Sequence, residues 1–366
     1  MRILLITDQA PDSQHSAIRG IFDHHLRERA EVTLVWFSRN RKDIAAGPDH
    51  VTLPWHYRRH GIWWHLAPPL PLPGFDIVIV RNLFPVLSAL TRMENRSFRL
   101  GFWESFPHRY RRLYEAERTG KAIWRKRLEY RICSRTEQRL VSRCDFYLPI
   151  TATYAQRFRP GLTLPLHPLP MGVDAESLPK AEAVPRPEKG TLRLFYAGAA
   201  DALRGFDLIL PALCRSDVDF VLDIYTFTPG SDALQPFASD ARIRIHPALP
   251  RRELLARMPS YDLGLSLIPP TPLYEVSSPT KTLEYFAMEL PALMTPIPEH
   301  LELFSDLKDL LTPFCEEDIM LALKRFAALP REKRHTLAAT GRDIVFAHRS
   351  YRVLAHGVHA FLENLR

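Results

Sequence analysis

One stretch of the sequence combines residue types that suit phosphate binding. Residues 277–293 read SSPTKTLEYFAMELPAL, and Pro279 is expected at the first helical position with Ser278 as the cap before it. The next turn leaves backbone N–H groups free at Thr280 and Lys281, beside the lysine ammonium. Free N–H groups, the positive end of a helix dipole and a cation together favour a phosphate group. An ordinary capped helix would show the same residues, so the interpretation depends on the rest of the chain.

Length and composition restrict the class of protein. A chain of 366 residues is too long for one compact core and predicts two domains, and its 46% hydrophobic and 25% charged residues are those of an ordinary soluble protein. No run of about 18 apolar residues predicts a membrane span, and the beginning, MRILLITDQAPD, is not a signal peptide. Reduced thiols in a cytoplasmic protein are expected, because no CxxC pairing and no His partner at metal spacing accompanies Cys133, Cys144, Cys214 and Cys315.

The elements that must position the phosphate-binding stretch alternate between strand and helix patterns in two blocks. Buried strands are predicted in the first block at 2–6, 32–37, 76–80, 99–103 and 145–150, with helices near 16–29, 84–95 and 121–143. After a Pro-rich charged linker at 170–190, strands are predicted at 192–198, 220–227, 243–249, 262–269 and 291–295, with helices at 202–214, 250–258 and in the stretch above. Apolar strands separated by helices indicate parallel sheets covered on both faces. We therefore expect two Rossmann-like domains facing across a cleft, with ligands at the carboxyl ends of the strands.

Several nucleotide-binding and catalytic motifs are missing from the sequence. Neither block carries GxGxxG after its first strand, which disfavours a nicotinamide or flavin enzyme. GxxxxGK[ST], GxSxG and HExxH do not occur either, which disfavours P-loop NTPases, serine hydrolases of the nucleophile-elbow type and zinc peptidases.

Three segments of the second block, at 195–213, 246–270 and 278–300, together resemble the retaining GT-B glycosyltransferases of family 4, also called glycosyl transferases group 1. PMGVD at 170–174 is similar to that family's crossover between domains, and the last helix resembles its returning terminal helix. The resemblance implies an acceptor-binding domain at 1–172, a nucleotide-sugar donor domain at 173–345 and a terminal helix at 346–366 that packs on the first domain.

The resemblance also implies residues for the donor diphosphate. The family's Gly-Arg…Lys-Gly matches Gly198-Ala199…Arg204-Gly205, so Arg204 is expected against the diphosphate. Ala199 has lost the family's arginine, and Lys281 is the expected replacement. Backbone or hydroxyl groups of Gly198, Ser278 and Thr280 complete the expected donor site.

Two glutamates are compared with the family's pair. Glu284 matches the second, which resembles a ribose-hydroxyl acceptor, whereas the first falls on Val276. Either the adjacent Glu275 meets the sugar hydroxyls, or that role is lost. The family's His-Asp after the fourth strand of the first domain is replaced by Trp103-Glu104, and His108 is expected near the donor sugar instead.

The implied reaction is transfer of a sugar from a nucleotide-diphosphate donor to a hydroxyl acceptor with retained configuration. Expected catalytic residues are Glu275, Arg204, Lys281 and His108. No DxD pair stands in the strand-end loops, so cations rather than a metal are expected on the diphosphate, and no cofactor is needed because the nucleotide-sugar is a substrate. Analogy alone suggests a lipid-linked or saccharide acceptor in surface polysaccharide or glycolipid synthesis. Two alternatives stay open: an epimerase of the same fold, and an inactive nucleotide-sugar-binding partner subunit, which the changes at Ala199, Val276 and Trp103-Glu104 favour.

Basic residues concentrate in one window of the first block. Between Arg109 and Arg139 eleven basic residues face four acidic ones, a net charge of +7, and arginines recur every fourth residue from Arg127 to Arg143. This row is either a solvated face paired with glutamates or a contact with an anionic lipid surface or a phosphate-bearing acceptor. Trp63 and Trp64 are candidate headgroup anchors, or pack against the sheet. Nucleic acid is not an expected partner, because the row lacks interleaved aromatic residues.

Overall fold

The chain divides into two compact units in the computed structural model, which describes residues 1–13, 15–181 and 190–365. The first unit comprises residues 1–171, 276–278 and 351–366, and the second comprises 172–275 and 279–350. The division after Met171 lies one residue before the predicted boundary. Part of the linker predicted at 170–190, residues 182–189, lies outside the described residues.

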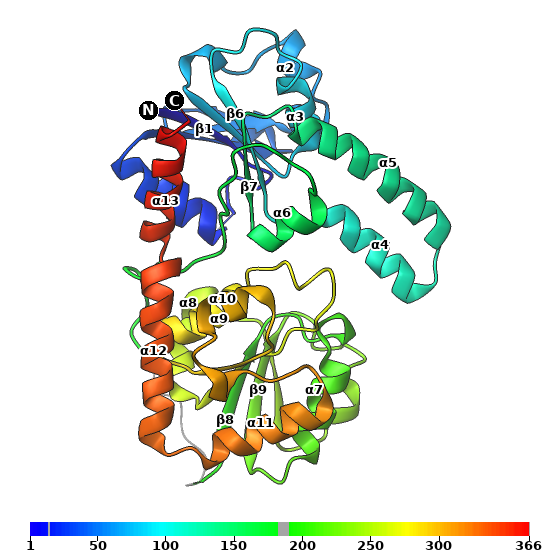
Figure 1. The fold of residues 1–366 in the computed structure, drawn as a ribbon, viewed down its shortest axis with the longest axis vertical. Coiled ribbons are helices and arrows are strands. Elements are labelled where there is room, and N and C mark those ends of the chain that lie inside the picture. The colour runs from blue at the N-terminus through cyan, green and yellow to red at the C-terminus, as the bar shows by residue number, and fades with distance from the viewer. Residues whose placement is uncertain (14, 182–189, 366) are drawn as a thin grey trace. The chain divides into compact units, whose positions relative to one another are not determined.

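The returning terminal segment begins later than predicted. Helix α12 (Arg331–Arg349) belongs to the second unit, and only α13 (Tyr351–Glu363) belongs to the first (Figure 1). Residues 346–350, assigned to the returning helix from sequence, are therefore part of the second unit. The short segment Val276–Ser278 also joins the first unit, which the sequence did not predict.

The first unit is built on a seven-stranded sheet. Its order is β3-β4-β2-β1-β5-β6-β7, and every pairing is parallel except that of β3 with β4. The strands are β1 (Arg2–Ile6), β2 (Glu31–Ser38), β3 (Ala45–Ala46), β4 (His50–Pro54), β5 (Ile77–Arg81), β6 (Arg99–Glu104) and β7 (Phe146–Pro149). The five strands predicted from apolar runs are confirmed, whereas the edge strand β3 and its neighbour β4 were missed.

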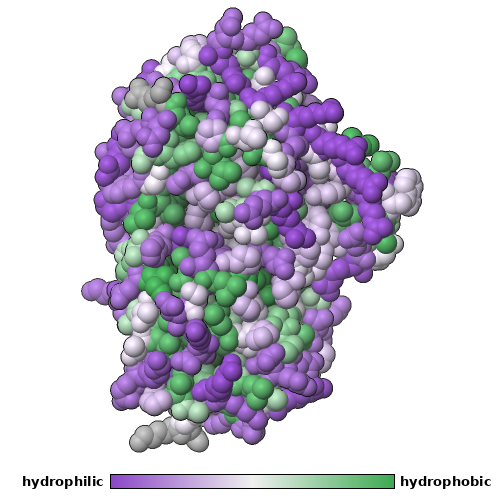
Figure 2. Space-filling view, in the orientation of Figure 1, coloured by the Kyte–Doolittle hydropathy of each residue, from purple (hydrophilic) through white to green (hydrophobic). Residues whose placement is uncertain are grey.

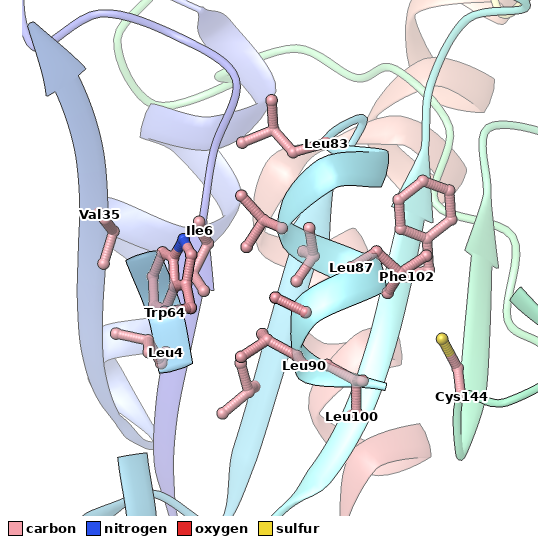
Figure 3. Close-up of a cluster of buried hydrophobic side chains, with 14 of the residues drawn as sticks. Leu4, Ile6, Val35, Trp64, Leu83, Leu87, Leu90, Leu100, Phe102 and Cys144 are labelled. Atoms are coloured by element: carbon pink, nitrogen blue, oxygen red, sulfur yellow. The ribbon is translucent and has the colours of Figure 1, made fainter. Parts of the chain in front are cut away.

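Hydrophobic cores cover both faces of this sheet because successive strand residues point to opposite sides. Leu4 and Ile6 of β1 join a core beneath α3 (Phe84–Leu90), whereas Ile3 and Leu5 join one that includes α13. Figure 3 shows Trp64 pointing into the first of these cores, beside Leu4 and Ile6. The remaining helical segments of the unit are Ile18–His24, His25–Glu28, Arg41–Asp43, α1 (Trp55–Arg59), α2 (Trp63–Leu66), Leu72–Gly74, α4 (His108–Thr119), α5 (Ile123–Val141) and α6 (Ala152–Phe158).

The second unit is built on a five-stranded parallel sheet of order β10-β9-β8-β11-β12. The strands are β8 (Leu192–Ala197), β9 (Phe220–Thr226), β10 (Ile243–Pro247), β11 (Leu263–Ser266) and β12 (Ala292–Met294). The helices besides α12 are α7 (Phe206–Arg215), α8 (Arg251–Arg257), α9 (Thr280–Ala287), α10 (Pro298–Phe304) and α11 (Glu316–Ala328). The predicted doubly wound α/β class with parallel sheets in both halves is confirmed. In the described part of the chain, no helix combines the length and the apolar character that crossing a membrane requires.

Helix α9 packs closely on the sheet of the second unit because β11 carries a glycine. A Cβ atom on Gly264 would lie 2.5 Å from Cδ2 of Tyr285, a distance that real Cβ contacts do not reach. The buried Tyr285 also accepts a hydrogen bond on its hydroxyl from the Ala197 amide of β8, at 3.3 Å. The position of α9 therefore depends on contact with two neighbouring strands.

We predict that Gly264→Ala lowers the free energy of unfolding of the second unit by about 1–3 kcal/mol, because the added methyl group must displace a fully buried aromatic ring. Urea unfolding followed by circular dichroism measures the change. Gly230→Ala is the matched control, because a Cβ there meets nothing within 4 Å. Equal stability of the two variants would contradict the proposed close packing.

Candidate functional site

The predicted phosphate-binding residues gather at one edge of the second sheet. The strand order runs from β8 outward in both directions, through β9 to β10 and through β11 to β12, so the β8–β11 pair is the point where the order reverses. Ligands of doubly wound sheets bind outside the carboxyl ends of the strands at such a point. Gly198 and Arg204 follow β8, and Lys281 follows β11 after a long loop, so residues distant in sequence reach the same edge.

Lys281 is held against the loop that follows β8. Its Nζ lies 4.0 Å from the centroid of the Tyr196 ring, and a Cβ on Gly198 would be only 3.5 Å from that Nζ. Gly198 also has φ of 135°, which disfavours any residue with a side chain. Burial, followed by the charge of Arg204, lowers the pKa of Lys281 well below 10.5, although Glu284 opposes the shift. Within the residues that the structure describes, this ammonium makes no ion pair.

Arg204 supplies a second cation without a carboxylate partner among the described residues. Its backbone N–H donates to Oδ1 of Asp201 at 3.0 Å, which fixes the turn, and Gly205 follows with φ of 75°. The guanidinium carbon lies 4.5 Å from the centroid of the Tyr274 ring. Each of the two cations rests on an aromatic face, and their like charges repel each other. Together they produce a positive electrostatic potential that a bound anion would neutralise.

Glu284, the predicted ribose acceptor, lies one turn after Lys281 on α9. Its Oε1 accepts a hydrogen bond from Nε of Arg251 at 2.6 Å. Burial raises the pKa of Glu284, and the charge of Arg251 counteracts the shift. Arg251, the first residue of α8, was missed from sequence, where only its place after Pro250 at the start of a helix could have singled it out.

The predicted cap at Ser278 is wrong. Helix α9 begins at Thr280, Pro279 occupies the capping position, and no side chain caps the helix. The hydroxyl of Ser278 instead accepts a hydrogen bond from the Met171 amide at 3.1 Å, within the first unit. Pro279 is extended, with ψ of 100°, and occupies the capping position itself, so the serine is one residue too far from the helix to cap it. Thr280 is half-buried at the first helical position.

The position that the family resemblance assigns to a sugar-binding glutamate has a packing role here. Val276 is buried with Ile150 and Tyr154 in the first unit, and its carbonyl oxygen accepts a hydrogen bond from the Thr151 hydroxyl at 2.9 Å. Glu275 is half-buried in the second unit, where its amide donates to the carbonyl of Thr271 at 2.9 Å. The structure thus separates the two neighbours between different units.

A buried polar chain holds the first turn of α9. Nδ1 of His300 lies 2.7 Å from the carbonyl oxygen of Thr295, which can only accept, so Nε2 must accept from the Thr282 hydroxyl at 2.9 Å. The oxygen of Thr282 then accepts from the Ser266 hydroxyl at 2.5 Å. Burial lowers the pKa of His300 to about 4, which keeps the ring neutral, as this chain of hydrogen bonds requires.

We predict that His300 makes the stability of the second unit dependent on pH. Its pKa falls from 6.5 to about 4 on folding, so between these values the unfolded chain binds a proton that the folded chain does not. The contribution is complete above pH 6.5 and is lost as the pH falls, by about 3 kcal/mol at pH 4.

Urea unfolding of the native chain and of His300→Gln at pH 7, 5.5 and 4 tests this. The difference in unfolding free energy between the two proteins should shrink as the pH falls, since every other titrating group is common to both. A difference that stays constant over this range would show that His300 is not the group responsible.

A cavity of about 500 Å³ lies at the carboxyl edge of the first sheet. His108, the first residue of α4, stands exposed at its rim, and partial burial of the ring lowers its pKa. The wall is formed by residues that follow β1, β5 and β6 and by helices α4, α5 and α6, and is rich in aromatic and charged side chains: Asp8, Arg58, Asn82, Phe84, Pro85, Glu104, Phe106, Pro107, His108, Arg109, Tyr110, Arg111, Arg112, Glu115, Tyr130, Ser134, Glu137, Tyr154, Phe158 and Arg159. These features suit a polar ligand with flat or ring-shaped parts.

The replacement of the family's His-Asp by Trp103-Glu104 has a structural explanation. Glu104 is buried and accepts hydrogen bonds from Arg159 at 2.9 and 2.5 Å and from the Tyr147 hydroxyl at 2.8 Å. Trp103 is fully buried in the core. A buried carboxylate held by a guanidinium on both oxygens contributes to the fold of the cavity floor, and only His108 remains as a candidate for the histidine's role.

Hydrogen bonds within the first unit also hold the loop that follows β1. His15, which follows β1, and Arg19, in the helical segment Ile18–His24, both have partners inside the unit. Nε2 of His15 lies 2.7 Å from the buried Arg81, which also donates to Asp8, and burial lowers the pKa of His15 to about 4. Arg19 donates to Asp23 at 2.7 Å. Arg81, missed from sequence, organises this corner.

The whole chain matches solved GT-B glycosyltransferases in structure. Trehalose-6-phosphate synthase OtsA matches with a TM-score of 0.69 at 14% identity, over 100% of this chain and 99% of that one. The α,α-trehalose-phosphate synthase (UDP-forming) of Burkholderia vietnamiensis matches with a TM-score of 0.68 at 14% identity, over 100% of both chains. Anabaena HepE, solved in complex with UDP and glucose, matches with a TM-score of 0.66 at 12% identity, also over 100% of both.

No protein-family model matches the sequence, and no curated protein matches it. At 12–14% identity the structural likeness establishes the fold. The chain has the GT-B fold.

Proposed function

We propose that the protein is a glycosyltransferase that moves a sugar from a nucleotide-diphosphate donor to a hydroxyl acceptor. The observation that carries the proposal is the pair of cations at the switch point of the second sheet, Arg204 and Lys281, which lack carboxylate partners among the described residues. A donor diphosphate carries about two negative charges and would satisfy both. HepE, of the same fold, was solved with UDP and glucose, which supports a ligand of this class.

In the proposed donor complex each residue of the second unit has a separate task. Lys281 and Arg204 bind the diphosphate together with the amides of the first turn of α9, whose dipole favours the same charge. Glu284 accepts hydrogen bonds from the ribose hydroxyls, with Arg251 holding its carboxylate in place. Glu275 is the proposed contact to the sugar hydroxyls.

The proposed reaction retains the configuration at the sugar carbon. The bond between that carbon and the diphosphate breaks, the acceptor oxygen bonds to the carbon on the same face, and the leaving diphosphate takes the acceptor's proton. The protein positions the reactants and stabilises the charge that develops on the diphosphate. This is the role proposed for Arg204 and Lys281, without a metal ion.

The acceptor is proposed to bind in the cavity of the first unit, with His108 at its rim. Tyr and Phe side chains in the wall offer flat faces for sugar rings, and Arg58 adds a cation that makes no ion pair within the described ranges. A lipid-linked or saccharide acceptor in cytoplasmic synthesis of a surface polysaccharide or glycolipid fits such a wall. The sequence resemblance supports the further proposal that the enzyme belongs to family 4.

An inactive nucleotide-sugar-binding subunit is the second candidate. It is favoured by Val276, which packs in the first unit where the resemblance places a glutamate, and by the ion pair that occupies Glu104. Donor binding would then persist without turnover.

We predict that Arg204→Ala and Lys281→Met each weaken binding of the nucleoside diphosphate about 10- to 100-fold, because each removes a charge-assisted contact worth about 1.5–3 kcal/mol. Binding of the plain nucleoside should not change. A thermal-shift screen first identifies the base, and calorimetry then gives both affinities. Lys308→Met, at an exposed lysine of the same unit, is the control and should bind like the native chain. Equal losses for nucleoside and nucleoside diphosphate would assign the two cations a structural role.

We also predict slow release of nucleoside diphosphate from the cognate donor without acceptor, unchanged by EDTA. Across the described residues, the group of His, Cys, Asp and Glu side chains close enough to hold a metal is His24, His25 and Glu28. These belong to the first unit, whereas the proposed diphosphate residues belong to the second. Coupled detection of the released nucleoside diphosphate measures the rate. No release would favour the inactive subunit, and loss of release in EDTA with recovery in Mg²⁺ would refute the cation mechanism.

A further inference from the structure

Helix α5 exposes a row of large apolar side chains on its outer face. Trp124, Leu128 and Ile132 are 75%, 52% and 56% exposed, and each is four residues after the last. Side chains at this spacing lie on one side of a helix. Figure 2 shows hydrophobic groups beside strongly hydrophilic ones over the α4–α5 hairpin, at the right of the view. We call the side of α5 that carries these residues its outer face.

The outer face also carries arginines that lack acidic partners. Arg125, Arg131, Arg135 and Arg139 are exposed, and Arg143 continues the row just past the helix. Among the described residues, none of these five makes an ion pair. The acidic residues of the hairpin are engaged elsewhere: Glu117 pairs with Arg127 at 2.9 Å, Glu129 with Lys126 at 2.7 Å, and Glu137 with Arg109 and Arg159.

The apolar row and the arginines together indicate which kind of partner would bind the outer face of α5. A second copy of the chain docked on the same face by a two-fold axis would bring two sets of unpaired arginines together. A nucleic acid would satisfy the arginines but would leave the aliphatic side chains without an apolar environment. The interface of an anionic bilayer accepts both, since phosphate headgroups pair with guanidinium groups while Trp, Leu and Ile enter the acyl boundary.

We propose that the outer face of α5 docks on an anionic membrane surface. The opposite side of the same helix lines the cavity of the first unit through Tyr130, Ser134 and Glu137. If that cavity holds the acceptor, a step that rests on the proposed function, docking would bring it next to the bilayer in which a lipid-linked acceptor resides. From sequence, Trp63 and Trp64 were the candidate anchors beside the basic window. Trp64 is instead fully buried and donates its indole N–H to the Tyr57 carbonyl at 3.0 Å.

The test is co-sedimentation of the full chain with vesicles of phosphatidylcholine alone and of phosphatidylcholine with phosphatidylglycerol. The native chain should bind the anionic vesicles at low salt, bind less as salt rises, and bind the neutral ones at least tenfold more weakly. Arg131→Gln, Arg135→Gln and Arg139→Gln together should weaken anionic binding about 50-fold or more, at about fivefold per charge. Trp124→Ser, Leu128→Ser and Ile132→Ser together should lose binding even at low salt.

Matched controls come from the same unit. Lys126→Gln with Glu129→Gln removes an ion pair of α5 without changing the net charge, and Ile62→Ser with Leu66→Ser removes two exposed apolar side chains outside α5. Both controls should bind vesicles within about threefold of the native chain. Circular dichroism verifies folding, which substitutions at exposed positions should preserve.

The proposal is overturned if the native chain ignores anionic vesicles at low salt, if neutral vesicles bind equally, or if the controls lose as much as the outer-face variants. Binding of a single-stranded oligonucleotide without vesicle binding would assign the arginines to nucleic acid. The vesicle assay contains no nucleotide, and the outer-face variants leave Arg204 and Lys281 intact. Failure of docking and failure of the proposed function are therefore seen in separate measurements.

Discussion

The parallel pairing of β8 with β11 is the constraint on which the candidate donor site depends. It places Leu194 opposite Leu263 and brings the loop with Arg204 and the first turn of α9 to one edge of the sheet. Tyr285 fixes α9 over both strands, and the neutral His300 completes a hydrogen-bond chain to β11 through Thr282. Each of these contacts must form before two cations more than seventy residues apart in sequence can meet one anion.

In this fold, charged side chains with an oppositely charged partner have structural roles, and those without one are the candidates for function. Burying a charge is costly unless a partner offsets the desolvation, and Glu104 with Arg159 meets that condition. Arg204 and Lys281 instead rest on aromatic rings, an arrangement that tolerates a cation but does not neutralise it. Such uncompensated charge persists in a folded protein most readily where a ligand supplies the counter-charge. The arginines on the outer face of α5, which make no ion pair within the described residues, present the same kind of uncompensated charge at a surface.

Local periodicity was sufficient to predict the interior elements. β1 and β5 are apolar at every position except one terminal arginine. Such a pattern indicates a strand covered on both faces, so the doubly wound class followed from sequence. Strand β4 was missed because its five residues mix His, Thr and Pro with two aliphatic side chains. Helix α4 was missed because eight of its twelve positions are His, Arg, Glu or Thr, and its packing against α5 is what stabilises it.

The sequence by itself determined the class of fold, the two halves and most of the candidate donor residues, because these depend on the pattern of neighbouring residues. Only the tertiary structure decided which side chains have partners. Arg127 and Arg131 belong to one row in the sequence, yet Glu117 from α4 pairs with the first, and among the described residues the second makes no ion pair. Ser278 stands in a sequence typical of a helix cap, but its hydroxyl accepts a hydrogen bond from the Met171 amide instead. Trp63 and Trp64 are adjacent in sequence, but only Trp64 is buried in the core. Pairing and burial depend on elements distant along the chain, and no local spacing encodes them.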